Sequence, residues 1–190
     1  MAPMAPIPHR RRTLHLRSLA LLGASLLVGG CDSSPTLTDP AEPDPLLQTG
    51  ALEYVLEPTS GAAHEVVIPY AFTNRTGAAV SIQNCDGIFS LGLERKTSDG
   101  WVRSWSSTLV LCQSAPIVIA PGESYHDFVT VRAAPPTARS GMEIPLESAE
   151  GVYRIVWDRP LTGFQLGSPQ TGTVLAKEQR VSNAFTMELP

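Results

Sequence analysis

Apolar and polar residues alternate in several short stretches of the chain. In one stretch, apolar side chains occupy every second position, at Val66, Ile68, Tyr70 and Phe72. A period of two places one set of side chains on one face of a β-strand. Similar apolar rows predict further strands at residues 89–93, 128–131, 153–157 and 181–189. The pattern therefore predicts a series of strands, each with one buried face.

Turn-forming residues separate these stretches. Residues 74–77, 98–100 and 120–123 combine Gly with Asn, Asp or Pro, which accept the backbone angles of tight turns. The 17 prolines and 15 glycines of the chain leave few windows long enough for a helix. Short strands separated by turns are typical of an antiparallel β-sandwich, and residues 51–190 are enough for one such domain.

The N-terminus has a different pattern. An apolar run at residues 18–28 follows a basic segment that contains four arginines and no acidic residue. A transmembrane helix needs about 20 apolar residues, so this shorter run fits a cleaved signal peptide over residues 1–30 better than a permanent span. Gly29 and Gly30 then supply small side chains directly before Cys31.

The segment from Leu26 to Cys31 resembles the lipobox of bacterial lipoproteins. The resemblance implies that Cys31 is the lipid attachment site, carrying acyl chains such as palmitate, and that the protein is anchored to a membrane of the bacterial cell envelope. The domain is then exported to the periplasm or the cell surface. Asp32 favours the inner membrane in some bacteria, but the choice between inner and outer membrane stays open. The alternatives are an ordinary secretory signal with an incidental Cys31, or a short uncleaved anchor.

Residues 31–50 are expected to form a tether. They contain four prolines and four acidic residues after Cys31 and show no hydrophobic period. Such a composition cannot bury enough apolar surface to offset its ordering entropy. We therefore expect a disordered, Pro-rich spacer between the lipid anchor and the domain.

The charge balance excludes one class of partner. The whole chain has a net charge of −4, and removal of residues 1–30 leaves 10 basic and 18 acidic residues. Nucleic-acid binding requires a basic surface that neutralises phosphates. We therefore expect no nucleic-acid partner.

The order of motifs resembles that of bacterial immunoglobulin-like domains, including those related to intracellular proteinase inhibitors. The residues that carry the resemblance lie at 70–74, 93–101, 120–123, 151–155 and 182–186. Tyr153 resembles the tyrosine of a tyrosine corner, whose hydroxyl bonds back to nearby backbone. Ile155 stands where antibody domains have a cysteine, so the resemblance is to the broader group of sandwiches.

Two cysteines follow Cys31. In an exported protein, Cys85 and Cys112 are expected to form a disulfide. The alternative is a metal site that also uses Asp86 and His126, but the chain lacks the close Cys and His spacings of zinc sites. We predict no bound metal and no cofactor.

Candidates for catalysis are few. The chain after residue 31 has two histidines, His64 and His126. His126 and Asp127 are neighbours on an expected strand, so their side chains point to opposite faces. No nucleophile elbow or phosphate loop is present. The carboxylates of Glu143, Glu147 and Glu150 share one segment and are interpreted as a solvated rim, so no catalytic residue is predicted.

The remaining candidates for a binding site are aromatic residues and long connections. Trp157 is expected in the core, while Trp101 and Trp105 are expected to share one face and to pack on their hairpin rather than bind a ligand. Two connections, residues 133–150 and 158–179, are longer than ordinary loops. The second is rich in apolar residues, which either form a partner site or cap the sandwich.

These observations predict an envelope lipoprotein whose sandwich is a non-enzymatic binding or structural module. Its partners are expected to be the membrane, through the lipid, and an envelope protein that the sequence does not identify. The alternative is a protease inhibitor that presents residues 158–179 as a loop, although three glycines there argue against a rigid loop. An envelope hydrolase is a third, weaker hypothesis.

Overall fold

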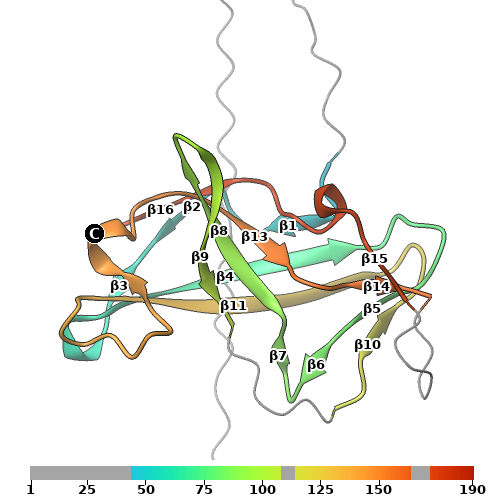
Figure 1. The fold of residues 1–190 in the computed structure, drawn as a ribbon, viewed down its shortest axis with the longest axis horizontal. Helices are drawn as coiled ribbons and strands as arrows, with labels where there is room; N and C mark the ends of the chain where they lie inside the picture. The colour runs from blue at the N-terminus through green and yellow to red at the C-terminus, as the bar shows by residue number, and fades with distance from the viewer. Residues whose placement is uncertain (1–43, 108–113, 164–171) are drawn as a thin grey trace, which may run out of the picture. The chain divides into compact units, whose positions relative to one another are not determined.

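The computed structural model describes residues 44–107, 114–163 and 172–190. Within these ranges the chain forms β-strands and three short 3₁₀ turns, and no α-helix is found there. The strands belong to several sheets that pack on one another (Figure 1). The expected all-β sandwich is therefore confirmed.

One five-stranded sheet is built on the long β4–β11 pair. β4 (His64–Thr73) and β11 (Ser124–Ala134) are antiparallel neighbours. β1 (Leu47–Thr49) and β3 (Glu57–Pro58) pair with the other edge of β4. β12 (Ile144–Pro145) pairs with β11 in the parallel direction, which is one of two departures from the predicted antiparallel arrangement.

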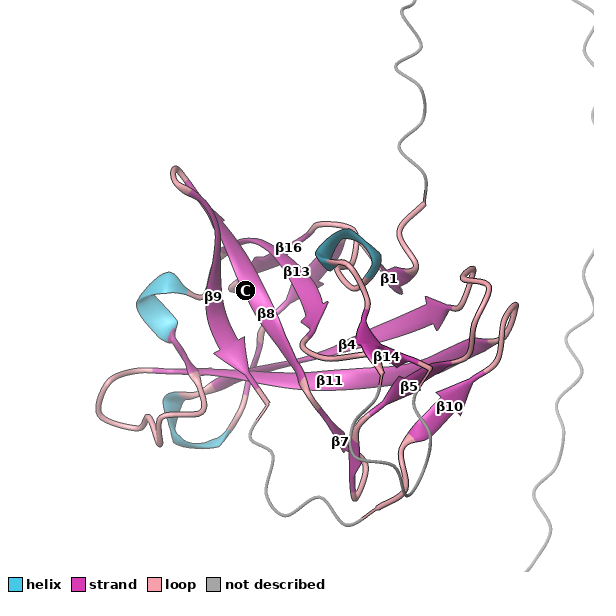
Figure 2. Ribbon diagram, turned by 45° about the vertical axis from the view of Figure 1, so that its right-hand side comes forward, coloured by secondary structure: helices cyan, strands magenta, loops and turns pink. Residues whose placement is uncertain are grey.

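The second five-stranded sheet has the order β2-β16-β13-β8-β9. Its strands are β2 (Glu53–Val55), β16 (Phe185–Glu188), β13 (Gly151–Trp157), β8 (Leu91–Thr97) and β9 (Gly100–Ser106). β2 and β16 form the other parallel pair. The β8–β9 hairpin runs across the direction of β4 and β11 in both ribbon views (Figures 1 and 2).

Smaller elements lie at one end of the sandwich and in the connections. A four-stranded sheet contains β10 (Ile117–Ile119), β5 (Val80–Ile82), β14 (Leu161–Thr162) and β15 (Thr173–Val174). A separate hairpin joins β6 (Asn84–Cys85) to β7 (Ile88–Phe89). The 3₁₀ turns are η1 (Ser60–Ala62), η2 (Leu146–Ser148) and η3 (Lys177–Gln179).

The core contains the alternating rows that the sequence predicts. Val66, Ile68, Tyr70 and Phe72 of β4 are each at most 6% exposed. They pack in one cluster with inward-facing side chains from the other five-stranded sheet, among them Leu93, Tyr153, Ile155, Trp157, Phe185 and Met187. The inner faces of the two sheets therefore form one core between them.

Several strands lie where the sequence predicts no structure. β1 begins at Leu47, inside the expected tether of residues 31–50, and the Leu47 side chain is fully buried. The long connection at residues 133–150 contains β12 and η2, and the one at 158–179 contains β14 and β15. These strands have two or three residues, too few to show a hydrophobic period.

Tyr153 makes the hydrogen bonds that its motif predicts. Its hydroxyl donates to the backbone carbonyls of Ser148 (2.9 Å) and Ala149 (3.0 Å). The side chain is fully buried, so these bonds satisfy a polar group that would otherwise lose its water. The contact also fixes the turn that leads from η2 into β13.

Candidate functional site

The outer face of the β13–β8–β9 sheet carries a cluster of charged and aromatic side chains. Arg154 lies directly opposite Glu94 on the neighbouring strand, and Lys96 lies opposite Trp101. Directly opposed residues in an antiparallel pair project to the same face, and so do residues two apart on one strand. We call these four residues, together with Lys177 of η3, the Trp101 cluster.

The Glu94 carboxylate accepts hydrogen bonds from two cations of the Trp101 cluster. The Arg154 Nε and Nη2 atoms donate to Glu94 Oε2 at 2.9 and 2.6 Å, and the Lys177 Nζ atom donates to Oε1 at 2.8 Å. The Arg154 guanidinium lies 4.3 Å from the centroid of the Trp101 ring, and Lys96 Nζ lies 5.3 Å from it. Cations at these distances are attracted by the π-electrons of the indole.

Glu94 is a nearly buried carboxylate. Only 6% of the residue is exposed. Burial alone would raise the pKa of Glu94, but hydrogen bonds and charges from Lys177 and Arg154 outweigh it and lower the pKa below its ordinary value of 4.5. The carboxylate is therefore held in its charged form, and it fixes the Arg154 side chain under the indole.

A β-bulge separates Trp105 from this face. The β8–β9 register shifts between Leu93 and Glu94, so Trp105 lies opposite Leu93 while Arg103 lies opposite Glu94. Leu93 is fully buried, and Trp105 packs against the same core. The prediction that Trp101 and Trp105 share one face is therefore wrong, because the extra residue of the bulge reverses the alternation.

Two contacts hold the bulged strand in place. The Trp105 indole Nε1 donates to the Met142 carbonyl at 2.7 Å. Arg103 forms an ion pair with Asp158, which directly follows β13. Its guanidinium passes over Gly92, where a Cβ atom would also lie 2.5 Å from the backbone carbonyl oxygen of Trp105, so a residue with a side chain does not fit there.

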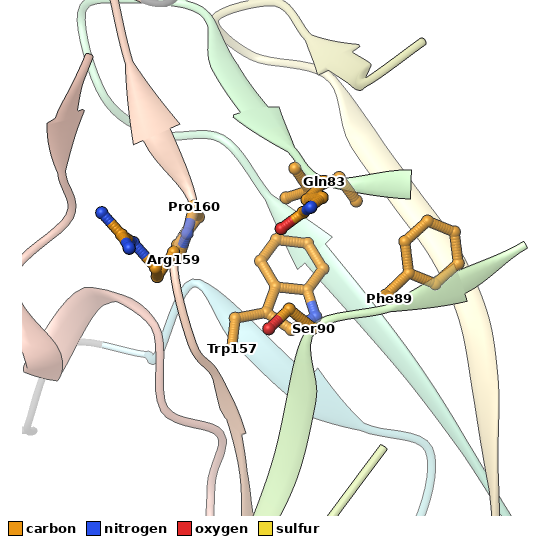
Figure 3. A pocket seen from close by; sticks show the side chains of 7 residues that line it. Gln83, Phe89, Ser90, Trp157, Arg159 and Pro160 are labelled. Carbon is orange, nitrogen blue, oxygen red and sulfur yellow. The ribbon is translucent and has the colours of Figure 1, made fainter. Parts of the chain in front are cut away.

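A small hollow lies beside Trp157. Figure 3 shows its lining side chains, which come from the end of β5, the β7–β8 region and the segment after β13: Ile82, Gln83, Phe89, Ser90, Trp157, Arg159 and Pro160. Trp157 is 2% exposed, so it is a core residue as predicted. The hollow has a cavity volume of about 10 Å³, far below the roughly 300–1,000 Å³ of most ligand pockets. We therefore assign it no ligand.

Asp127 faces two tyrosines on the inner side of β11. The Tyr125 hydroxyl donates to Asp127 Oδ2 at 3.0 Å, and Tyr70 lies opposite Asp127 on β4. Burial and the nearby Asp127 carboxylate raise the pKa of both tyrosines above the ordinary value. The tyrosines therefore stay neutral and supply no reactive phenolate. Tyr125 contributes its hydrogen bond to Asp127, and Tyr70 contributes the packing of its ring in the core.

The predicted catalytic and metal candidates lie apart. His126 is exposed while Asp127 is half-buried on the opposite face of β11, as their adjacency predicts. Glu143 accepts hydrogen bonds from Ser140, whereas Glu150 accepts one from the Leu189 amide. Across the described ranges, no group of three or more His, Cys, Asp or Glu residues could hold a metal ion.

Some predicted sites lie outside the described residues. These are the lipid attachment site Cys31, one partner of the expected disulfide, Cys112, and part of the 158–179 connection. Cys85 is described, and its side chain is fully buried in β6. In the described part of that connection, Leu175 is buried against the core while Val174 is 38% exposed.

Sequence reasoning did not find the Trp101 cluster. The cluster depends on Lys177, which lies 83 residues from Glu94 in the chain. The one available signal was the row of Glu94 and Lys96 on the polar face of β8, which alternates with the buried Leu91 and Leu93.

Comparisons with known proteins do not place the chain in a family. No protein-family model matches it, and a search of curated proteins finds no significant relative. Among the helices in the described part of the chain, none has the length and apolar character needed to cross a bilayer.

Proposed function

We propose that this protein is a lipid-anchored lipoprotein of the bacterial envelope, and that its immunoglobulin-like sandwich is a non-enzymatic binding module for an envelope protein. The lipobox-like segment ending at Cys31 and the Pro-rich segment after it support the anchoring. The Trp101 cluster supports the binding role.

The fixed arrangement of Trp101 and Arg154 is the observation that carries the binding role. Tryptophan and arginine are the residues most enriched at the energetic centres of protein interfaces. The Arg154 side chain is held by two hydrogen bonds to Glu94 and lies against the indole. Binding therefore costs little side-chain entropy at this position.

The charges of the Trp101 cluster define the partner. Arg154 and Lys177 pair with the single carboxylate of Glu94, and Lys96 adds a third cation over the Trp101 ring. The cluster is therefore locally positive although the chain as a whole is acidic. Opposite charge on the partner would increase the association rate and favour one orientation. The partner surface is therefore expected to be acidic, with an apolar side chain that covers the indole.

Cross-linking in the host tests the binding role. A photo-crosslinking amino acid at the exposed Asp99, in the turn beside Trp101, is expected to give a discrete product with one envelope protein. The product should fall at least severalfold when Trp101→Ala is added, because the indole supplies most of the apolar contact. The same probe at the exposed Ala138 is the control and should give no such product. An Asp99 product that is unchanged by Trp101→Ala would contradict the assignment.

Intact-mass analysis tests the anchor and the disulfide. The protein isolated from host membranes is expected to begin at Cys31 with added acyl mass, and Cys31→Ala should abolish both cleavage and lipidation. We also propose a disulfide between Cys85 and Cys112, so reduction should add the mass of two hydrogen atoms. A chain cut elsewhere without acyl mass would contradict the anchor, and an unchanged mass on reduction would contradict the disulfide.

A further inference from the structure

β9 is the last strand of its sheet and has one free edge. Among the described residues β9 pairs with β8 on one side and has no neighbouring strand on the other. In both ribbon views the tip of the β8–β9 hairpin projects beyond the other strands (Figures 1 and 2). The free edge of a sheet carries unpaired backbone N–H and C=O groups, which can pair with another chain.

The hydrogen bonds of β8 show which residues of β9 bond inward. The Ser107 amide donates to the Leu91 carbonyl, whereas the Asp158 amide, which follows β13, donates to the Ser90 carbonyl. β8 therefore directs its odd-numbered residues to β9 and its even-numbered residues to β13. The extra residue of the bulge lies in β9, so this alternation continues along β8 to Arg95.

The backbone groups of Trp101 and Arg103 point to the free edge. Val102 lies opposite Arg95, so it forms the hydrogen bonds to β8 in this part of the hairpin. In an antiparallel pair, the residues on either side of a bonded residue direct their N–H and C=O groups away from the partner strand. Trp101 and Arg103 therefore offer four backbone groups to an added strand.

The accessible part of this edge is short. The bond from Trp105 Nε1 to the Met142 carbonyl holds the 133–150 connection beside the far end of β9, so an added strand is limited to residues 100–103. There the Val102 side chain is 50% exposed, and Trp101 on the opposite face is partly exposed. Both faces of the hairpin are therefore open to the side chains of an added strand.

Cations predominate on the outer face beside this edge. The face carries four of them: Lys96, Arg103, Arg154 and Lys177. They pair with two carboxylates, Glu94 and Asp158, which leaves an excess of positive charge. A second copy of the chain would bring two such positive faces together, whereas an acidic segment would be attracted. The charges therefore favour an acidic segment at this edge.

We propose that the free edge of β9 binds an extended, acidic segment of the envelope partner as an added strand. This inference rests on the proposed binding role of the Trp101 cluster and deepens it. Main-chain hydrogen bonds to Trp101 and Arg103 supply affinity, and alternate side chains supply specificity. Acidic side chains lie on the face of the four cations, and an apolar side chain on the other face covers Val102.

A synthetic peptide tests the added strand. A fluorescein-labelled heptapeptide of alternating Glu and Val is titrated with the full chain in detergent, and binding is followed by fluorescence anisotropy. Saturable binding is expected, and a peptide of alternating Lys and Val should bind at least tenfold more weakly because its charge is opposite. No saturable binding of the acidic peptide, or equal binding of both peptides, would overturn the proposal.

Methylated peptides test the main-chain pairing. Residues directly opposite Trp101 and Arg103 share their face, so the Glu residues of the peptide direct their N–H groups to β9 and the Val residues direct theirs away. N-methylation of the Glu residues should therefore weaken binding about tenfold, whereas N-methylation of the Val residues is the matched control and should have little effect. Equal effects of the two modifications would show that no strand is added.

Variants of Arg103 test the same pairing from the side of the protein. Arg103→Pro and Arg103→Ala both remove the ion pair with Asp158, but only proline also removes the N–H group at the free edge. An edge strand accepts proline at such a position. Peptide binding should be severalfold weaker for Arg103→Pro than for Arg103→Ala, and equal binding would contradict the added strand.

The cross-link at Asp99 separates this inference from the proposed function. An Asp99 product that falls with Trp101→Ala, together with failure of the peptide tests, would keep the binding role and overturn the added strand. A product that is unchanged by Trp101→Ala would contradict the binding role itself. Self-association of the full chain that is lost in Val102→Lys would assign the edge to a second copy and would also overturn the inference.

Discussion

Replacement of Trp157 with alanine is expected to lower the free energy of unfolding by about 4 kcal/mol. Trp157 is 2% exposed, and its ring packs against Phe72 and Tyr70 with centroid distances of 4.7 and 6.1 Å. Both rings belong to β4, so the substitution removes a contact that joins the two five-stranded sheets. Urea denaturation followed by circular dichroism measures the loss.

Trp101→Ala is the matched control for Trp157→Ala. Trp101 lies on the outer face of its sheet, partly exposed, and its main contacts are the two cations of the cluster. Its removal should cost about 1 kcal/mol, the contribution of an exposed cation–π contact. Equal losses for both tryptophans would show that the core and surface assignments of the two indoles are incorrect.

Replacement of Glu94 with alanine is expected to lower the free energy of unfolding by about 3 kcal/mol at neutral pH. The substitution leaves the Arg154 guanidinium, whose side chain is 17% exposed, without its carboxylate partner. Lys177 loses its partner too, but its side chain is 47% exposed and can be solvated. The dominant cost is therefore the unpaired Arg154, and the double variant Glu94→Ala with Arg154→Ala should recover part of the lost stability.

The contribution of Glu94 should also depend on pH. Its pKa is lower in the folded chain than its ordinary value of 4.5, so the stabilisation is complete above the unfolded pKa. It is lost as the pH falls below 4.5 and through the folded pKa, because protonation removes the charge that holds both cations. Urea denaturation measures the free energy of unfolding at neutral pH and at about pH 3. The difference between these two values should be smaller for Glu94→Gln than for the natural chain.

The exposed Glu147 provides the control for this pH series. Glu147→Gln changes the formal charge by the same amount outside the Trp101 cluster. The free energy of unfolding of this variant should therefore depend on pH in the same way as that of the natural chain. If Glu94→Gln and Glu147→Gln gave identical profiles, the ion pairs of Glu94 would contribute no measurable stability.

Local sequence patterns were sufficient to predict the strands that have enough residues to show a period. The rows Val66–Phe72 and Tyr153–Trp157 alternate over five residues or more, and their inward faces are those that the core buries. Tyr153 was also predictable, because its hydroxyl bonds to residues four and five positions away in the chain. In each of these cases the physical cause lies within a short stretch of sequence.

Tertiary structure alone decided the features that depend on strand pairing. The bulge at Leu93 and Glu94 places Trp101 and Trp105 on opposite faces of the sheet. The local sequence pattern does not reveal the bulge, because one extra residue leaves that pattern unchanged. β1 and β2 are strands because β4 and β16 supply partners for them, and three residues are too few to form a strand unaided.

The Trp101 cluster also depends on contacts between distant parts of the chain. Glu94 and Lys177 meet because η3 lies beside the β13–β8 pair, although 83 residues separate them along the chain. The sequence determined which residue types are available for binding, and only the pairing of distant strands decided which of them meet, because those contacts are set by register and not by local pattern.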